Sequence, residues 1–196
     1  MRSVPSDVPD HRLAELVEGS TATEALTPAR ALELGSGHGR NAVYLAAHGW
    51  AVTGVELDET SVRISRFKAE DEAVPVRFVH GDVTKLSTLD VGDGYTLLMD
   101  HGCFHALTAP ARDDYVREVS AVAAPGALLV LVAFSKFKSA PVTEEEVRQR
   151  FTGWELLAVD PVPGKQLAEY VLRPLIARFL VSTNMFQAYR YQLVRL

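Results

Sequence analysis

Apolar runs and helical patterns of hydrophobic residues alternate along the chain. The apolar runs predict strands over residues 29–34, 50–57, 75–82, 94–100, 127–134, 154–160 and 185–196. Apolar residues at helical spacing predict helices over residues 11–18, 40–48, 59–71, 112–123 and 143–151. This alternation is typical of an α/β protein with a doubly wound sheet, in which ligands bind beyond the carboxyl ends of the strands.

The sequence gives further detail for two of these helices. Pro125 and Gly126 follow the helix over 112–123 and are expected to stop it, because neither residue continues a helix well. The apolar residues of the helix over 59–71 are Val62, Ile64 and Phe67.

The length of 196 residues suits one α/β domain and is too short for two. We expect residues 29–196 to form this domain. Residues 1–28 are expected to be an N-terminal segment whose short helix, ended by Gly19, covers a cofactor at the first glycine loop. Residues 161–183 are expected to be an apolar helical insertion before the last strand, for which a lid, a dimer face, a membrane-surface contact and a helix packed on the sheet stay open.

Composition and charge narrow the choice of partners. The net charge is −5 and no run of Lys or Arg occurs, so we expect no nucleic-acid partner. Cys103 is the only cysteine, which excludes an internal disulfide and a site built from several thiolates, and no metal is expected. The first ten residues lack the apolar core of a signal peptide, and residues 161–183 are too short and too charged to span a bilayer. We therefore expect a cytoplasmic monomer or homodimer without an integral membrane segment.

The stretch ALELGSGHGR places Gly35, Gly37 and Gly39 directly after the first predicted strand. Glycines in this position indicate that backbone lies against a ligand. The first four predicted strands all carry an acid at or near their ends, namely Glu33, Glu56, Asp82 and Asp100. These carboxylates would repel a pyrophosphate and would favour a ligand with an amino group and a sulfonium, such as S-adenosylmethionine (SAM). Glu56 suits ribose hydroxyls, although a solvated Glu beside a helix cap at Asp58 explains it as well.

Four stretches between residues 29 and 135 resemble, in order, the motifs of class I SAM-dependent methyltransferases. These are ELGSGHGRNAVYLA, VELD, the GD pair at Gly81 and Asp82, and AAPGALLVL, in which Ala127 replaces a glycine that is frequent in the family. DHGCFHAL further resembles the branch that includes thiopurine, tellurite-resistance and thiol or halide methyltransferases. The resemblance implies a Rossmann-like, seven-stranded, mostly parallel sheet with an antiparallel last strand. It also implies SAM as cofactor and S-adenosylhomocysteine (SAH) as product.

The resemblance also implies roles for single residues. Glu33 would orient the methionine end of the cofactor, Glu56 would bind its ribose, and Asp82 with the Val83 N–H would bind its adenine. Asp100 and His101 would form the wall near the methionine amino group and the reactive methyl. The full set of expected cofactor-binding residues is Glu33, Gly35, Ser36, Gly37, Gly39, Asn41, Glu56, Leu57, Asp82, Val83, Asp100 and His101.

Methyl transfer from a sulfonium is an in-line displacement that needs a well-placed acceptor and no protein nucleophile. An acceptor that must lose a proton needs a base, for which His105 and His101 are the candidates. His105 is also explained as a residue that shapes the loop, and Cys103 as a small buried hydrophobe.

The sequence therefore predicts a SAM-dependent methyltransferase that acts on a small-molecule acceptor, a thiol, oxyanion, halide or phenol-like compound, by SN2 methyl transfer. A non-catalytic SAM-binding domain and a nucleotide-binding oxidoreductase on the same fold stay open as alternatives.

Overall fold

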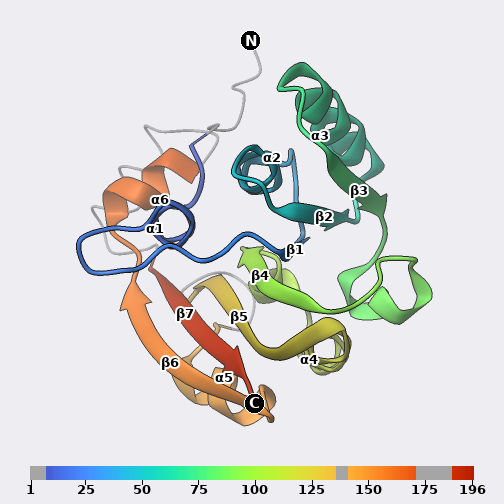
Figure 1. Cartoon of the computed structure of the whole chain (residues 1–196). Helices are drawn as coiled ribbons and strands as arrows, with labels where there is room; N and C mark the ends of the chain where they lie inside the picture. Colours follow the sequence, from blue (N-terminus) through green and yellow to red (C-terminus); the bar gives the residue numbers. More distant parts are fainter. Residues whose placement is uncertain (1–7, 136–140, 171–186) are drawn as a thin grey trace.

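A seven-stranded sheet forms the centre of the structure, a computed structural model that describes residues 8–135, 141–170 and 187–196 (Figure 1). The strands lie in the order β3-β2-β1-β4-β5-β7-β6. β1 to β5 pair in parallel, and β7 is antiparallel to both β5 and β6. The strands are β1 (Arg30–Leu34), β2 (Ala51–Glu56), β3 (Val76–His80), β4 (Tyr95–His101), β5 (Ala123–Phe134), β6 (Trp154–Pro161) and β7 (Ala188–Arg195). The predicted fold class is confirmed, including the antiparallel last strand.

Helices cover both faces of the sheet (Figure 1). One apolar core joins α1, α2 and α3 to one face of β1, β4 and β5, and a second core joins α4 and α5 to the other face. Neighbouring residues of β5 alternate between the cores, since Val130 lies in the first, and Leu129 and Leu131 lie in the second. The helices are α1 (His11–Glu18), α2 (Arg40–Ala47), α3 (Glu59–Asp71), α4 (Ala109–Val122), α5 (Glu144–Arg150) and α6 (Gly164–Tyr170), with 3-10 turns η1 (Val83–Thr88) and η2 (Phe104–Ala106).

The bounds of one predicted helix need correction, and the buried face of another is not its most apolar one. The helix predicted over 112–123 begins at Ala109 and ends at Val122, because β5 already starts at Ala123 and contains Pro125 and Gly126. In α3 the buried residues are Val62, Ser65 and Ala69, whereas Ile64 and Phe67 are 41% and 70% exposed. Small side chains thus let α3 lie close to the sheet, and its two larger apolar residues point outward.

Residues 161–183 are described only in part. β6 ends at Pro161, and α6 covers Gly164–Tyr170. The rest of the predicted apolar insertion, from residue 171 to 183, lies outside the described residues. Within the described ranges, no helix is long and apolar enough to cross a membrane.

A buried carboxylate attaches the N-terminal helix to the rest of the domain. Asp10 caps α1, since its Oδ1 accepts hydrogen bonds from the Arg12 and Leu13 amides at 3.0 and 3.2 Å. Its Oδ2 lies 2.8 Å from Nη2 of Arg190 on β7, and its own N–H donates to Oδ1 of Asn41 on α2 at 3.0 Å. Burial raises the pKa of Asp10, but Arg190 and the other partners outweigh this effect, so the pKa is lowered and the carboxylate is charged.

Replacement of this carboxylate should therefore be costly. We expect Asp10→Ala to lower the free energy of unfolding by about 3 kcal/mol, because it removes a helix cap and leaves the buried Arg190 without its anion. Urea unfolding at neutral pH measures this loss. Asp90→Ala is the control, since Asp90 pairs with Arg77 on the surface with a side chain that is 99% exposed, and it should change stability very little. An equal effect of both variants would contradict the role of Asp10.

Candidate functional site

The carboxyl ends of β1, β2 and β4 meet at one edge of the sheet. The register places Leu34 beside Val55 on one side and beside Asp100 on the other, and Glu56 lies beside His80 of β3. Glu33, Glu56 and Asp100 therefore lie on neighbouring strands, and Asp82 follows the end of β3. This edge is where open α/β sheets bind ligands.

The glycine loop between β1 and α2 turns through backbone conformations that favour glycine. Gly35, Gly37 and Gly39 have φ angles of +68°, +52° and +79°. The N–H groups of Gly35 and Ser36 donate to the Val55 carbonyl at 2.9 and 3.0 Å, and the Gly37 N–H donates to Glu56 Oε2 at 2.8 Å. The loop is thus fastened to the end of β2 before any ligand binds.

Glu33 lies beneath the start of α2 and is only 3% exposed. Its Oε1 accepts from Asn41 Nδ2 at 2.9 Å, and its Oε2 accepts from the Ala42 N–H at 3.0 Å. Burial raises the pKa of Glu33 to about 7, against the opposing effect of these hydrogen bonds. The ionised form of Glu33 would therefore gain from a cation that approaches from the crevice.

Glu56 ends β2 and keeps its carboxylate at the surface of the loop. Besides the Gly37 N–H, it accepts the Asp58 N–H on Oε1 at 2.8 Å, and Asp58 in turn caps α3 through the Ser61 N–H. Each carboxylate oxygen has a further lone pair for a hydroxyl donor. Leu57, the next residue, is 68% exposed.

Asp82 caps η1 and faces partly outward. Its Oδ1 accepts the N–H and the hydroxyl of Thr84 at 2.9 and 2.7 Å. Burial acts to raise the pKa of Asp82, but the two Thr84 bonds and nearby Lys85 together outweigh it, so this pKa is lowered. Val83 follows as the first residue of η1 and is 6% exposed.

Asp100 is fully buried and holds the chain that follows β4. Its two oxygens accept hydrogen bonds from the N–H groups of Gly102, Cys103 and Phe104, at 3.0, 2.8 and 3.0 Å, and from the Tyr115 hydroxyl at 2.8 Å. Burial raises its pKa to about 6. The expected direct contact of this carboxylate with a cofactor does not fit, because its lone pairs are taken up inside the protein.

The two histidines lie on either side of the chain reversal after β4. His101 Nε2 lies 3.6 Å from Asp10 Oδ2, and burial, followed by the charge of Arg40, lowers its pKa to about 3. The ring of His105 packs edge-on against Phe134, with centroids 4.8 Å apart, and burial followed by Arg112 lowers its pKa to about 4. Both imidazoles are therefore neutral at physiological pH.

Cys103 packs against the glycine loop. A Cβ added to Gly35 would lie 2.7 Å from the Cys103 Cβ, so the absence of a side chain at Gly35 lets the two segments touch. Burial raises the pKa of the Cys103 thiol well above its usual range. This is the state of an unreactive packing residue, which agrees with the interpretation of Cys103 as a small buried hydrophobe.

Several residues at this edge were not found by sequence reasoning. Asp10 and Arg190 approach His101 from segments 180 residues apart in the chain. From α4, Arg112 donates to the His105 carbonyl and Tyr115 donates to the Asp100 carboxylate. The sequence could have indicated Asp10 as a helix cap, because an Asp immediately before a predicted helix is a typical N-cap residue. No local sequence pattern indicates the two arginines, since their partners are distant in sequence.

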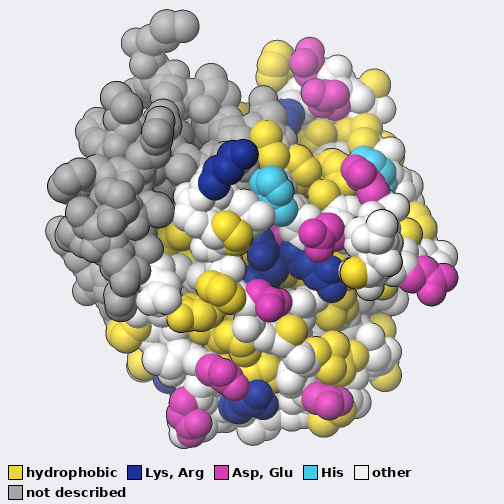
Figure 2. All heavy atoms as spheres, turned by 90° about the vertical axis from the view of Figure 1, so that its left-hand side faces the viewer, with side chains coloured by type: hydrophobic (Ala, Val, Ile, Leu, Met, Phe, Trp, Pro, Cys, Tyr) yellow, Lys and Arg dark blue, Asp and Glu magenta, His cyan; other side chains and the backbone are white. Residues whose placement is uncertain are grey.

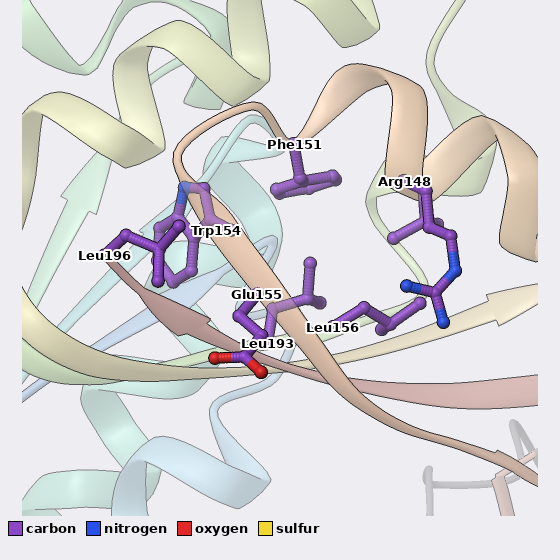
Figure 3. Close-up of a pocket in the computed structure, with 8 residues that line it drawn as sticks. Arg148, Phe151, Trp154, Glu155, Leu156, Leu193 and Leu196 are labelled. Atoms are coloured by element: carbon purple, nitrogen blue, oxygen red, sulfur yellow. The ribbon is translucent and has the colours of Figure 1, made fainter.

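The described part of the chain also has clefts away from the glycine loop, and two of them are as follows. A cleft of about 360 Å³ lies between α5, the start of β6 and the end of β7, and is lined by Phe151, Trp154 and Leu196 among others (Figure 3). It lies at the amino end of β6, so it is remote from the edge that carries the four acids. A second, polar cleft of about 380 Å³ lies between α1, α6 and β7, on a face where basic and acidic side chains are interspersed (Figure 2).

Comparison with solved structures gives the same fold. The 1,6-didemethyltoxoflavin-N1-methyltransferase of Burkholderia thailandensis, with bound 1,6-didemethyltoxoflavin and S-adenosylhomocysteine, superposes with a TM-score of 0.68 at 18% identity, over 94% of this chain and 77% of that chain. The [4+2]-cyclase SpnF superposes with a TM-score of 0.70 at 18% identity, over 94% of this chain and 80% of that chain. The fold therefore occurs in proteins of different named activities.

Sequence comparison identifies the family. A 2-heptyl-1-hydroxyquinolin-4(1H)-one methyltransferase of Mycobacteroides abscessus is 28% identical over 127 residues, which cover 60% of this chain and 55% of that protein. The chain spans about half the length of the curated relatives that it matches. Residues 31–126 match the family described as "Methyltransferase domain", and these residues contain the glycine loop and all four strand-end acids. Over these residues the chain thus matches the methyltransferase family, and this match together with the fold supports a class I SAM-dependent methyltransferase.

Proposed function

We propose that this protein binds SAM at the edge formed by β1, β2 and β4 and transfers its methyl group to a small-molecule acceptor. The observation that carries the proposal is the glycine loop, with three positive φ angles, bound to Glu56 and lying beside the buried Glu33. When bound, SAM supplies a methyl group that its sulfonium already activates. The task of the chain is then to bind, to orient and to exclude water.

The residues present suit a positively charged nucleoside. Glu33, with its pKa raised to about 7 by burial, would favour the cationic methionine end. Glu56 would accept the ribose hydroxyls beside the exposed Leu57, and Asp82 with Val83 would bind the adenine edge. The remaining predicted residues, Gly35, Ser36, Gly37, Gly39 and Asn41, would shape the loop and the start of α2.

The neutral histidines favour a certain kind of acceptor. His105, with a pKa of about 4, is unprotonated at neutral pH and can therefore accept a proton. Its low pKa also makes it a weak base. It suits an acceptor that loses its proton easily or carries none, such as a thiol, an acidic phenol, an oxyanion or a halide. The resemblance of residues 100–107 to the thiopurine, tellurite-resistance and thiol or halide branch points to the same group of acceptors.

The N-terminal segment would serve as the cover of this site. Asp10 connects α1 to Asn41 of α2 and lies 3.6 Å from His101, so the start of α1 lies directly beside the expected methyl-transfer region. We keep residues 29–196 as the catalytic domain and residues 1–28 as its cover.

Two alternatives make different demands on the site. A SAM-binding domain without turnover would bind the cofactor and transfer nothing, and the likeness to a protein named as a cyclase shows that this fold hosts other chemistry. A nucleotide-binding oxidoreductase would place a pyrophosphate at the glycine loop. The carboxylates of Glu33 and Glu56 beside that loop count against such a ligand.

SAM binding should depend on pH through Glu33. Between pH 6 and pH 8 the ionised fraction of a carboxyl with a pKa of about 7 rises about tenfold, so wild-type affinity should rise by up to that factor. The sign follows because the cation binds the deprotonated form. Isothermal titration of SAM against wild type and Glu33→Gln tests this, with the ratio of the two affinities as the readout that cancels the ligand's own titration.

The titrations test the role of Glu33 separately from the methyltransferase proposal. A ratio that grows with pH supports Glu33 as the group that binds the methionine end, and a constant ratio contradicts it. Binding of NAD without binding of SAM or SAH would overturn the methyltransferase proposal as a whole.

Turnover should reveal whether His105 takes a proton. We expect His105→Ala to slow methylation of a thiol or phenol by about a hundredfold, the usual contribution of a general base, and to leave methylation of iodide nearly unchanged because iodide has no proton to lose. A screen of these acceptors with methyl-labelled SAM measures both rates, with SAM affinity as the control. Equal losses for both acceptor types, or none, would remove His105 as a base.

A further inference from the structure

Residues 102–106, here called the post-β4 segment, are held from two sides by buried groups of opposite charge. Asp100 accepts hydrogen bonds from N–H groups at the start of this segment, and Arg112 of α4 donates hydrogen bonds to carbonyls near its end. Both side chains are fully buried, with 0% exposure. The segment therefore lies between an anion and a cation that each bind its peptide groups.

The Asp100 carboxylate is surrounded by hydrogen-bond donors of the protein itself. Asp100 accepts from three successive N–H groups, and the Tyr115 hydroxyl from α4 adds a fourth donor. A carboxylate that accepts several N–H bonds orders the peptide units it touches, because each bond fixes a separate direction. The start of the post-β4 segment thus has one favoured conformation.

The bonds to the carbonyls at the end of the post-β4 segment depend on the forked shape of the Arg112 guanidinium. Arg112 Nε donates to the Phe104 carbonyl at 3.3 Å, and its Nη2 donates to the His105 carbonyl at 3.2 Å. Its Nη1 lies 2.8 and 2.9 Å from the two carboxylate oxygens of Glu146 on α5. The guanidinium carbon also lies 5.2 Å from the centre of the Phe104 ring. A lysine ammonium cannot reach all of these groups at once.

The post-β4 segment touches the cofactor loop and the expected acceptor region. The Cys103 side chain fills the space that a side chain at Gly35 would need. The His105 ring packs on Phe134 at the carboxyl end of β5. A shift of the segment would therefore move both the support of the glycine loop and the candidate base.

We propose that Arg112 is a positioning residue which, together with Asp100, fixes the post-β4 segment so that Cys103 supports the glycine loop and His105 faces the acceptor. Glu146 orients Arg112 from α5. This inference rests on the proposed function, because it assumes that the glycine loop holds the cofactor. It assigns a role in the site to a residue that lies seven positions beyond His105, in the interior of α4.

The test compares Arg112→Lys with the matched variant Arg150→Lys. Arg150 donates to the same Glu146 carboxylate at 2.9 Å but its contacts are to Glu146, Asp113 and the Ala109 carbonyl, outside the post-β4 segment. SAH affinity is measured by isothermal titration at a temperature where all variants are folded. We expect Arg112→Lys to weaken SAH binding about tenfold and Arg150→Lys to leave it unchanged.

A spectroscopic readout separates positioning from a general loss of stability. Burial lowers the pKa of His105 most, and the charge of Arg112 lowers it further, so Arg112→Met should raise that pKa in an NMR titration of the imidazole. Amide hydrogen exchange at residues 102–104 should also become faster. Arg150→Lys should change neither quantity, even if it lowers the melting temperature.

The outcomes also distinguish this inference from the proposed function. If wild-type protein does not bind SAH, the proposed function fails. If wild type binds SAH and Arg112→Lys binds it equally well, with unchanged His105 resonances and amide exchange, the positioning role of Arg112 is overturned.

Discussion

The peptide N–H groups that are left free where strands end and helices begin must find acceptors, and in this protein buried or half-buried carboxylates supply them. Glu56 accepts the Gly37 and Asp58 amides, Asp82 accepts the Thr84 amide, and Asp100 accepts three successive amides. Glu33 and Asp10 do the same at the starts of α2 and α1. The geometry of the whole edge follows from these bonds, because each acid fixes the backbone that surrounds the crevice.

The same bonds change the electrostatic description of the site. A count of acids suggests a ring of four full negative charges, but burial raises the pKa of Glu33 to about 7 and that of Asp100 to about 6. The lowered pKa of Asp82 keeps a negative charge on the more open side, while the charge of Glu33 responds to what binds. A cationic ligand draws out the charge of Glu33, whereas a pyrophosphate would keep it protonated.

Sequence reasoning predicted the alternation of strands and helices, the glycine loop and the acids at the strand ends, because these depend on local patterns along the chain. It did not show which side of α3 is buried, since a helix that packs closely on a sheet can bury Ser65 and Ala69 and expose larger residues. It could not find Arg112 or Arg190, whose partners are distant in the chain. It also assigned Asp100 to the ligand, because a buried carboxylate that binds peptide amides has the same sequence appearance as one that binds a cofactor.

The central claim is that the crevice at the ends of β1, β2 and β4 holds the nucleoside of SAM. A crystal structure of the protein with SAH tests it most directly. The account requires the ribose hydroxyls at the Glu56 carboxylate, the adenine beside Asp82 and Val83, and Asp100 still bound to the Gly102, Cys103 and Phe104 amides. SAH bound elsewhere, or a direct bond from the ligand to the Asp100 carboxylate, would contradict the account.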